Sequence, residues 1–156
     1  MLIKIILLFT ILAYSIVVGQ SYMYFIALKN AQLGMQAKSY IEFRKLLDAG
    51  FNAKFKYVMY AVLITNLLLV LITVKQPAGL LFITAATAFI AIVIDTMIAV
   101  KGNIPINNLI NTWSADQYPG NWFTYRTKWL QYFRYRQLAN ITGFISLAIG
   151  AIFGMQ

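Results

Sequence analysis

Hydrophobic residues gather in four long runs along the chain, and most polar residues fall between them. The runs cover about residues 5–28, 57–74, 79–100 and 138–155. Each is near the roughly 20 residues that a helix needs to cross the hydrocarbon core of a bilayer. Together they hold a single charged residue, Asp95, as expected where a charge in lipid is costly. The pattern predicts an all-α integral membrane protein, a four-helix bundle that forms one domain over residues 1–156.

Two long connections, 29–56 and 101–137, separate these runs. In the first, two pairs of residues with opposite charge stand four apart, Lys38 with Glu42 and Arg44 with Asp48. Apolar residues recur there at helical spacing, at Tyr40, Phe43, Leu46 and Leu47. We therefore predict a cytoplasmic amphipathic helix at the membrane interface, ending near Gly50 and Asn52. The third run is predicted to end similarly at Gly102, because Pro105 disfavours helical geometry in the residue before it. A second amphipathic helix is expected in the second connection, beginning after Asn121.

The charge distribution predicts how the chain is oriented in the membrane. The chain has 13 Lys and Arg residues against 4 Asp and Glu, a net charge of +9. The two long connections carry eleven of these cations, and the opposite side carries only Lys4 and Lys75. By the positive-inside rule, both connections are predicted to be cytoplasmic and both termini extracytoplasmic, in a bacterial inner membrane. The lipid bilayer thus explains the charge, and nucleic-acid binding is not predicted.

The residue inventory limits the chemistry that the protein can perform. The chain has no cysteine and no histidine, which excludes disulfides, Cys/His zinc sites, His-ligated haem and His-based triads. The four acidic residues are too scattered along the sequence for a dedicated site for a hard cation. We therefore predict no metal and no cofactor.

Asp95 is the one charge inside the predicted spans, so another group must stabilise it. Winding the third run as an α-helix places only small residues within about 40° of it: Thr84, Ala88, Ala91, Ala99 and Gly102. Such a face either lets a neighbouring helix approach closely or leaves room for a ligand beside the carboxylate. A structural salt bridge and a functional role therefore both stay open.

The helix that follows Asn121 offers partners for Asp95. Six of its residues share a stripe about 80° wide: Trp122, Arg126, Trp129, Phe133, Arg136 and Asn140. We predict that Arg126 or Arg136 pairs with Asp95. In the alternative, the stripe is an interfacial aromatic belt in which the arginines stack on tryptophans.

Other intramembrane features add to this picture. Gln20 and Asn66, with Tyr24 and Tyr60 nearer the cytoplasmic ends, indicate a polar chamber, although each alone is usually a helix–helix contact. The fourth run carries a stripe of small residues, namely Ala139, Gly143, Ser146, Gly150 and Gly154. This stripe is a packing face, either within the chain or between copies of a homo-oligomer that associates through Gly150 and Gly154.

The segment from Asp95 to Asn140 carries a recognisable set of motifs. It contains Gly102-Asn103-Ile-Pro-Ile-Asn107-Asn108, Trp113, and Trp122-x3-Arg126-x2-Trp129-x6-Arg136. This pattern resembles the small four-helix membrane proteins grouped with the anthrone oxygenases, most of which have no assigned function. The resemblance implies that Asn103, Pro105, Asn107, Trp129 and Arg136 are family-signature residues.

The resemblance also implies an activity, the oxidation of a flat tricyclic anthrone by dioxygen without metal or flavin. Such chemistry needs a base, a stabiliser for an oxyanion and a dry pocket. Asp95 would be the base and Arg126 or Arg136 the stabiliser. Asn103, Asn107, Trp113, Trp122 and Trp129 would form the pocket wall, with Gln20 and Asn66 in the polar chamber.

Two classes of function stay open. One is a cofactor-independent oxygenase acting on a hydrophobic aromatic small molecule of the anthrone or quinone type. The other is a non-catalytic membrane module that binds a lipid-like ligand or a protein partner. An open cavity with unpaired polar groups would favour the enzyme, whereas a closed hydrogen-bond network would favour the module.

Overall fold

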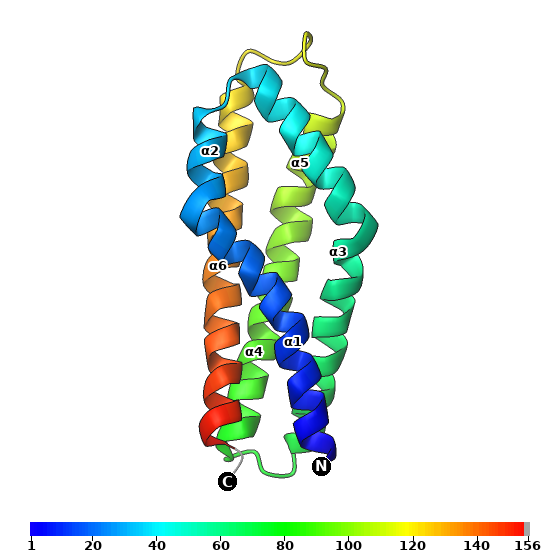
Figure 1. Ribbon diagram of the computed structural model, residues 1–156, viewed down its shortest axis with the longest axis vertical. Coiled ribbons are helices and arrows are strands. Elements are labelled where there is room, and N and C mark those ends of the chain that lie inside the picture. Colours follow the sequence, from blue (N-terminus) through cyan, green and yellow to red (C-terminus); the bar gives the residue numbers. More distant parts are fainter. Residues whose placement is uncertain (155–156) are drawn as a thin grey trace.

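The computed structural model describes residues 1–154 and contains four long helices in an elongated bundle (Figure 1). They cover Leu2–Gly34, Ala37–Thr73, Leu80–Asn111 and Trp122–Phe153, and each is long and apolar enough to cross a membrane. The predicted runs fall on these four helices, apart from the end residues Val74, Gly79 and Gly154; Met155 lies outside the described residues. The predicted all-α four-helix bundle is confirmed, and its four helices have the length and apolar character that membrane spans require.

Two of the long helices contain a short π-helical segment, in which a turn takes up an extra residue. The first helix consists of α1 (Leu2–Met23), η1 (Tyr24–Leu28) and α2 (Lys29–Gly34). The second is α3 (Ala37–Thr73). The third consists of α4 (Leu80–Ile98), η2 (Ala99–Asn103) and α5 (Ile104–Asn111), and the fourth is α6 (Trp122–Phe153).

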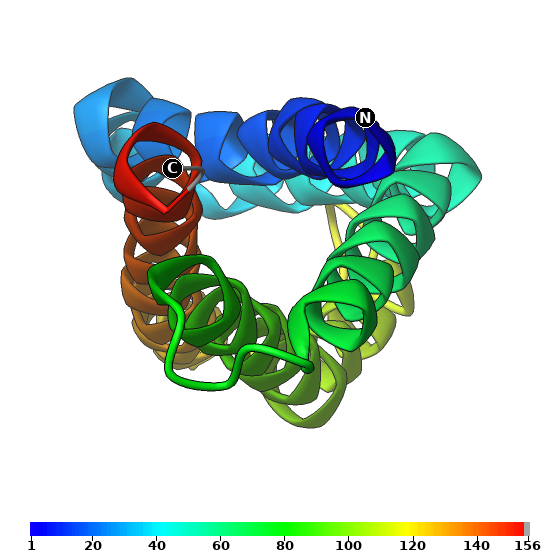
Figure 2. The same ribbon diagram turned by 90° about the horizontal axis from the view of Figure 1, so that it is seen from below.

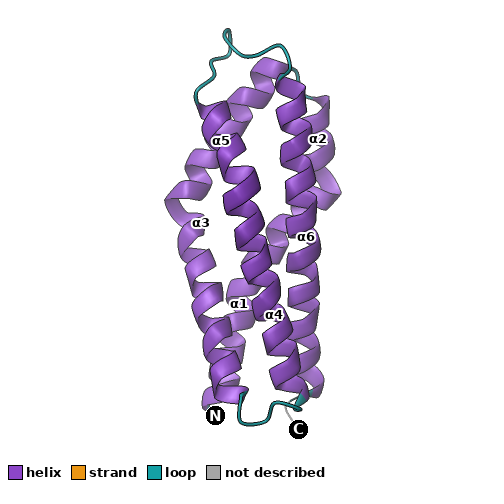
Figure 3. Ribbon diagram, turned by 180° about the vertical axis from the view of Figure 1, so that it is seen from behind, coloured by secondary structure: helices purple, strands orange, loops and turns teal. Residues whose placement is uncertain are grey.

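The helices follow one another around a common axis in the order α1, α3, α4 and α6 (Figure 2). The N-terminus, the turn between α3 and α4, and the end of α6 lie at one end of the bundle, and the other loops lie at the opposite end (Figures 1 and 3). The two cation-rich connections therefore share one end, as predicted. That this end faces the cytoplasm stays a prediction.

Both helix ends predicted from glycine and proline are wrong. The α3 helix runs through Gly50 and Asn52 without a break, because the cost of about 1 kcal/mol for one glycine is small beside the helical turns that continue into the apolar run. The third helix likewise continues past Gly102 to Asn111. Pro105 is tolerated because it stands in the first turn of α5, where its missing N–H group matters least.

Small residues let α4 and α6 pack closely together. A Cβ atom on Gly143 would collide with the Tyr14 hydroxyl and would lie 2.9 Å from the Ala91 Cβ. One on Gly150 would collide with Thr84 Oγ1, and one on Gly154 would lie 2.8 Å from the backbone nitrogen of Leu81. The small-residue stripe therefore packs within the chain. Homo-oligomerisation through Gly150 and Gly154 stays a prediction.

Candidate functional site: a polar cavity beside α3

The middle of α3 contains no fully buried residue. Its buried residues stop at Asp48 and resume at Val62, one long stretch of helix later. A cavity of about 290 Å³ occupies this stretch, near the lower end of the size range of ligand pockets. Both π-helical segments contribute to its wall, through Tyr24 of η1 and Asn103 of η2.

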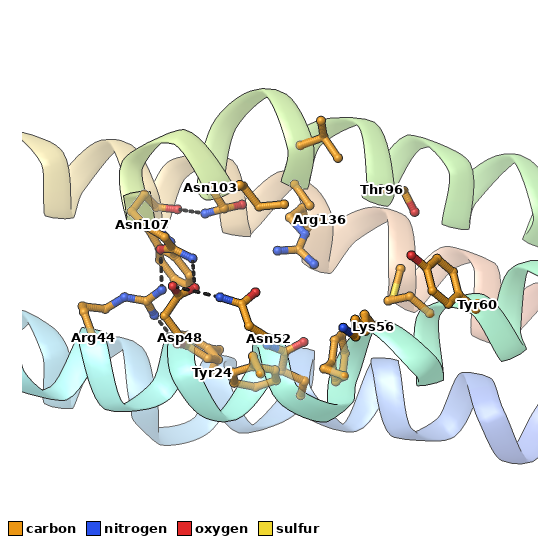
Figure 4. Close-up of a pocket in the computed structure, with 18 of the residues that line it drawn as sticks. Tyr24, Arg44, Asp48, Asn52, Lys56, Tyr60, Thr96, Asn103, Asn107 and Arg136 are labelled. Atoms are coloured by element: carbon orange, nitrogen blue, oxygen red, sulfur yellow. Dashed lines mark hydrogen bonds between the residues drawn. The ribbon is translucent and has the colours of Figure 1, made fainter. Parts of the chain in front are cut away.

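Asp48 connects α3 to α5 at one end of the cavity (Figure 4). Its Oδ1 atom accepts a hydrogen bond of 2.8 Å from the Asn107 amide, and its Oδ2 atom accepts bonds from Asn111 at 2.7 Å and from Asn52 at 3.1 Å. The carboxylate is only 8% exposed, so these three donors replace the water that burial removes.

Arg44 completes this network from the preceding turn of α3. Its guanidinium donates to Asn107 Oδ1 at 2.7 Å and to the Tyr24 hydroxyl at 3.2 Å, and it stacks 3.9 Å from the Trp129 ring centroid. Trp129 in turn donates its indole N–H to the same Asn107 oxygen at 2.8 Å. Asn107 thus bridges Arg44 and Asp48, so the two charges meet through a carboxamide rather than as the expected direct i,i+4 pair.

Asp95 forms the predicted ion pair, and its partner is Arg136. The carboxylate is fully buried, and its Oδ1 atom lies 2.7 Å from Arg136 Nε and 3.2 Å from the Asn140 amide nitrogen. The alternative partner is wrong. Arg126 donates instead to the backbone oxygens of Gln32 and Met35, both at 3.0 Å, and lies over the Trp122 ring.

Five of the residues predicted for the site line the cavity: Gln20, Asn103, Asn107, Trp129 and Arg136. Asp95 does not, because it lies behind Arg136 in the interface between α4 and α6. The Asn103 amide donates to the Trp129 carbonyl at 2.9 Å, while its oxygen is buried with no partner in the described part of the chain.

Three other residues predicted for the site do not line this cavity, and a role for them in binding stays a prediction. Asn66 joins α3 to α4, with an amide orientation that donates to the Ala85 carbonyl at 3.1 Å. Trp113 packs edge-on against Tyr125, and its carbonyl accepts a bond from Lys45. Trp122 packs against Tyr40 near the start of α3. Both tryptophans lie nearer the loops than the cavity does, because Trp113 follows the end of α5 and Trp122 is the first residue of α6.

Most of the cavity wall that α3 supplies, apart from Tyr60, was not predicted from the sequence. This wall contains a polar stripe with a spacing of four residues: Arg44, Asp48, Asn52, Lys56 and Tyr60. The spacing was a usable signal, since residues four apart share a helix face. It was hidden by the predicted helix end at Gly50, which divided the stripe between two elements.

The site provides binding groups and little that resembles a metal centre. No group of three acidic side chains within residues 1–154 could hold a metal ion. Asp48 is the only carboxylate among the described residues of the cavity wall, which also carries the cations Arg44, Lys56 and Arg136. The wall can therefore hold an apolar molecule and meet oxygen atoms on it with charged and amide donors.

Comparison with known proteins finds no matching protein family, no matching curated protein and no matching solved structure. Fold and cavity together define the class of the molecule, a four-helix bundle whose helices are long and apolar enough to cross a membrane, with a partly open cavity beside α3.

Proposed function

We propose that the protein binds a flat hydrophobic small molecule that carries oxygen atoms, of the quinone or anthrone type, in the cavity beside α3. The observation that carries this proposal is the composition of the wall. Apolar side chains, among them Phe55, Met59 and Leu63, line the cavity together with Trp129 and with charged and amide donors. Aromatic and aliphatic walls with a few polar groups are typical of small-molecule sites.

The position of the cavity suggests how such a ligand enters. Three of its wall residues are among the exposed apolar side chains of the bundle, namely Tyr60, Val100 and Ile104, which come from α3, η2 and α5. In a bilayer these side chains face lipid. A hydrophobic ligand can therefore pass from the membrane into the cavity between α3 and the third long helix.

The cavity is partly open, and its wall includes Asn103, whose oxygen is unpaired within residues 1–154; this favours an enzyme. The state of the two acidic residues, however, favours binding over catalysis. Asp95, the candidate base, is satisfied by Arg136 and Asn140 and does not reach the cavity. Asp48 reaches it but already accepts three carboxamide hydrogen bonds. A general base needs access to the proton that it removes. An oxygenase of the anthrone type therefore remains the second candidate, with Asp48 rather than Asp95 as its base.

The proposed location is a bacterial inner membrane, with both termini outside and the cavity in the cytoplasmic half. The eleven-to-two division of Lys and Arg supports this orientation. A single cysteine at position 128 should react with an impermeant thiol reagent only after cells are opened, whereas one at position 75 should react in intact cells. Labelling in the reverse order would invert the topology.

The ligand proposal is tested with 9-anthracenemethanol, a neutral, fluorescent tricyclic compound, added to the purified protein in detergent. At a free concentration 100 times its Kd, a ligand stabilises the native state by about 2.7 kcal/mol, so the melting temperature should rise measurably. Ala99→Trp should abolish this rise by filling the cavity, because Ala99 is part of its wall.

Ala61→Trp is the matched control. Ala61 is exposed on α3 and does not line the cavity, so this variant should bind the compound as the wild type does. Equal binding by both tryptophan variants would place the ligand elsewhere, in the detergent or on the outer surface. Oxygen consumption with anthrone as substrate, in protein free of added metal and flavin, would move the conclusion to the enzyme.

A further inference from the structure

The charges around the cavity do not balance. Arg44, Lys56 and Arg136 contribute three positive charges to its wall. Asp48 contributes one negative charge, and Asp95 a second from behind Arg136. One positive charge is left over. An unpaired positive charge beside an apolar cavity favours a ligand that carries a negative charge.

The Arg136 guanidinium is held so that one of its nitrogens stays free. Nε bonds to Asp95 Oδ1 at 2.7 Å, and Nη2 contacts Oδ2 at 3.5 Å. Nη1 has no hydrogen-bond partner among residues 1–154, although the whole side chain is only 10% exposed. Figure 4 shows this guanidinium directed from α6 into the cavity, toward α3. Asp95 thus acts as a positioning residue that orients a donor toward the cavity.

Lys56 faces Arg136 from the α3 side. It lies along α3 between Asn52 and Tyr60 (Figure 4), and no carboxylate of the described residues pairs with it. Its Nζ atom lies 5.2 Å from the centroid of the Tyr57 ring. The left-over charge is therefore at Lys56, at the exposed edge of the cavity and opposite a free arginine N–H.

We propose that the ligand is a monoanion: a hydrophobic body with a single acidic oxygen group, such as a carboxylate, bound between Arg136 Nη1 and Lys56. This inference rests on the proposed function and adds the charge of the ligand to it. One negative charge neutralises the cavity, and charge-assisted hydrogen bonds to it are about twice as strong as neutral ones. The apolar body then lies along Met59 and Leu63, toward the lipid-facing opening.

The test compares two probes with the same ring system, anthracene-9-carboxylate and neutral 9-anthracenemethanol, by fluorescence titration in a non-ionic detergent. Lys56→Gln should weaken binding of the carboxylate about tenfold, as expected for a lost hydrogen bond to a charged group, and should leave binding of the alcohol within about twofold. Comparing each variant with the wild type cancels the different partitioning of the probes into micelles.

Lys54→Gln is the matched control, because Lys54 is an exposed lysine on the same helix that does not line this cavity. It should leave both affinities unchanged. A second variant, Lys56→Glu, reverses the left-over charge and should abolish carboxylate binding while permitting 9-(aminomethyl)anthracene to bind as a cation.

The outcomes separate the two proposals. If Lys56→Gln changes both affinities equally, or Lys54→Gln weakens the carboxylate as much, the ligand is not recognised as an anion. If the alcohol binds the wild type but not Ala99→Trp, and the carboxylate does not bind, the cavity is a ligand site for neutral molecules and only the charge inference fails. If neither probe binds the wild type, both proposals fail.

Discussion

Replacement of Asp95 by alanine should lower the free energy of unfolding by about 3 to 5 kcal/mol, the usual cost of breaking a buried ion pair from one side. Arg136 would keep its charge but lose its contact with the carboxylate, in an interface where its side chain is only 10% exposed. Asn140 would lose an acceptor as well. Thermal unfolding in detergent, followed by circular dichroism, measures the effect.

Asp95→Asn separates charge from shape, since the carboxamide has nearly the same size but no charge. We expect it to be nearly as destabilising as alanine, because the arginine still lacks its counter-ion. Lys128→Ala is the control, since Lys128 is an exposed cation on α6 and surface substitutions rarely exceed about 0.5 kcal/mol. Similar losses in Asp95→Asn and Lys128→Ala would show that the ion pair does not support the fold.

The pair between Asp95 and Arg136 was within reach of sequence reasoning because both residues obey simple geometry. A lone charge in an apolar run demands a partner, and helical winding left two arginines on the inward stripe. Which of the two arginines pairs with Asp95 could not be predicted from the sequence. Arg126 is held by backbone carbonyls at the junction between α2 and α3, and no periodicity in the sequence predicts where such free carbonyls lie.

The cavity was predicted less completely than the fold because α3 was expected to end near position 50. Glycine and asparagine near position 50 were treated as a helix end, although their local cost is small beside the turns that flank them. The part of the stripe from Arg44 to Lys56 was therefore not predicted, although Tyr60 at its end was. The π-helical turn η2 has no sequence signal of this kind, yet it lies in the cavity wall with Asn103. Such turns are frequent at functional sites.

Asp48→Ala should be the second large effect, again about 3 to 5 kcal/mol. The carboxylate accepts hydrogen bonds from Asn52, Asn107 and Asn111. Asn107 also accepts a bond from Arg44, so the negative charge of Asp48 compensates the positive charge of Arg44 through this carboxamide. Removal leaves amide donors without acceptors and a buried guanidinium without a counter-charge, and both are costly. Chemical unfolding of the purified protein in detergent checks the size of the loss.

A double-mutant cycle tests whether Arg44 and Asp48 act as one unit, as the Asn107 bridge requires. The double variant with alanine at both positions should lose less stability than the sum of the two single losses, by about 0.5 to 3 kcal/mol, because the second substitution removes a charge that the first left unbalanced. Asp116→Ala is the control for loss of an acidic residue, since the Asp116 side chain is 91% exposed and its contact with Lys38 is a surface pair at 3.9 Å. Strictly additive losses would mean that Asn107 does not couple the two charges, and that the α3 wall of the cavity is held by apolar packing instead.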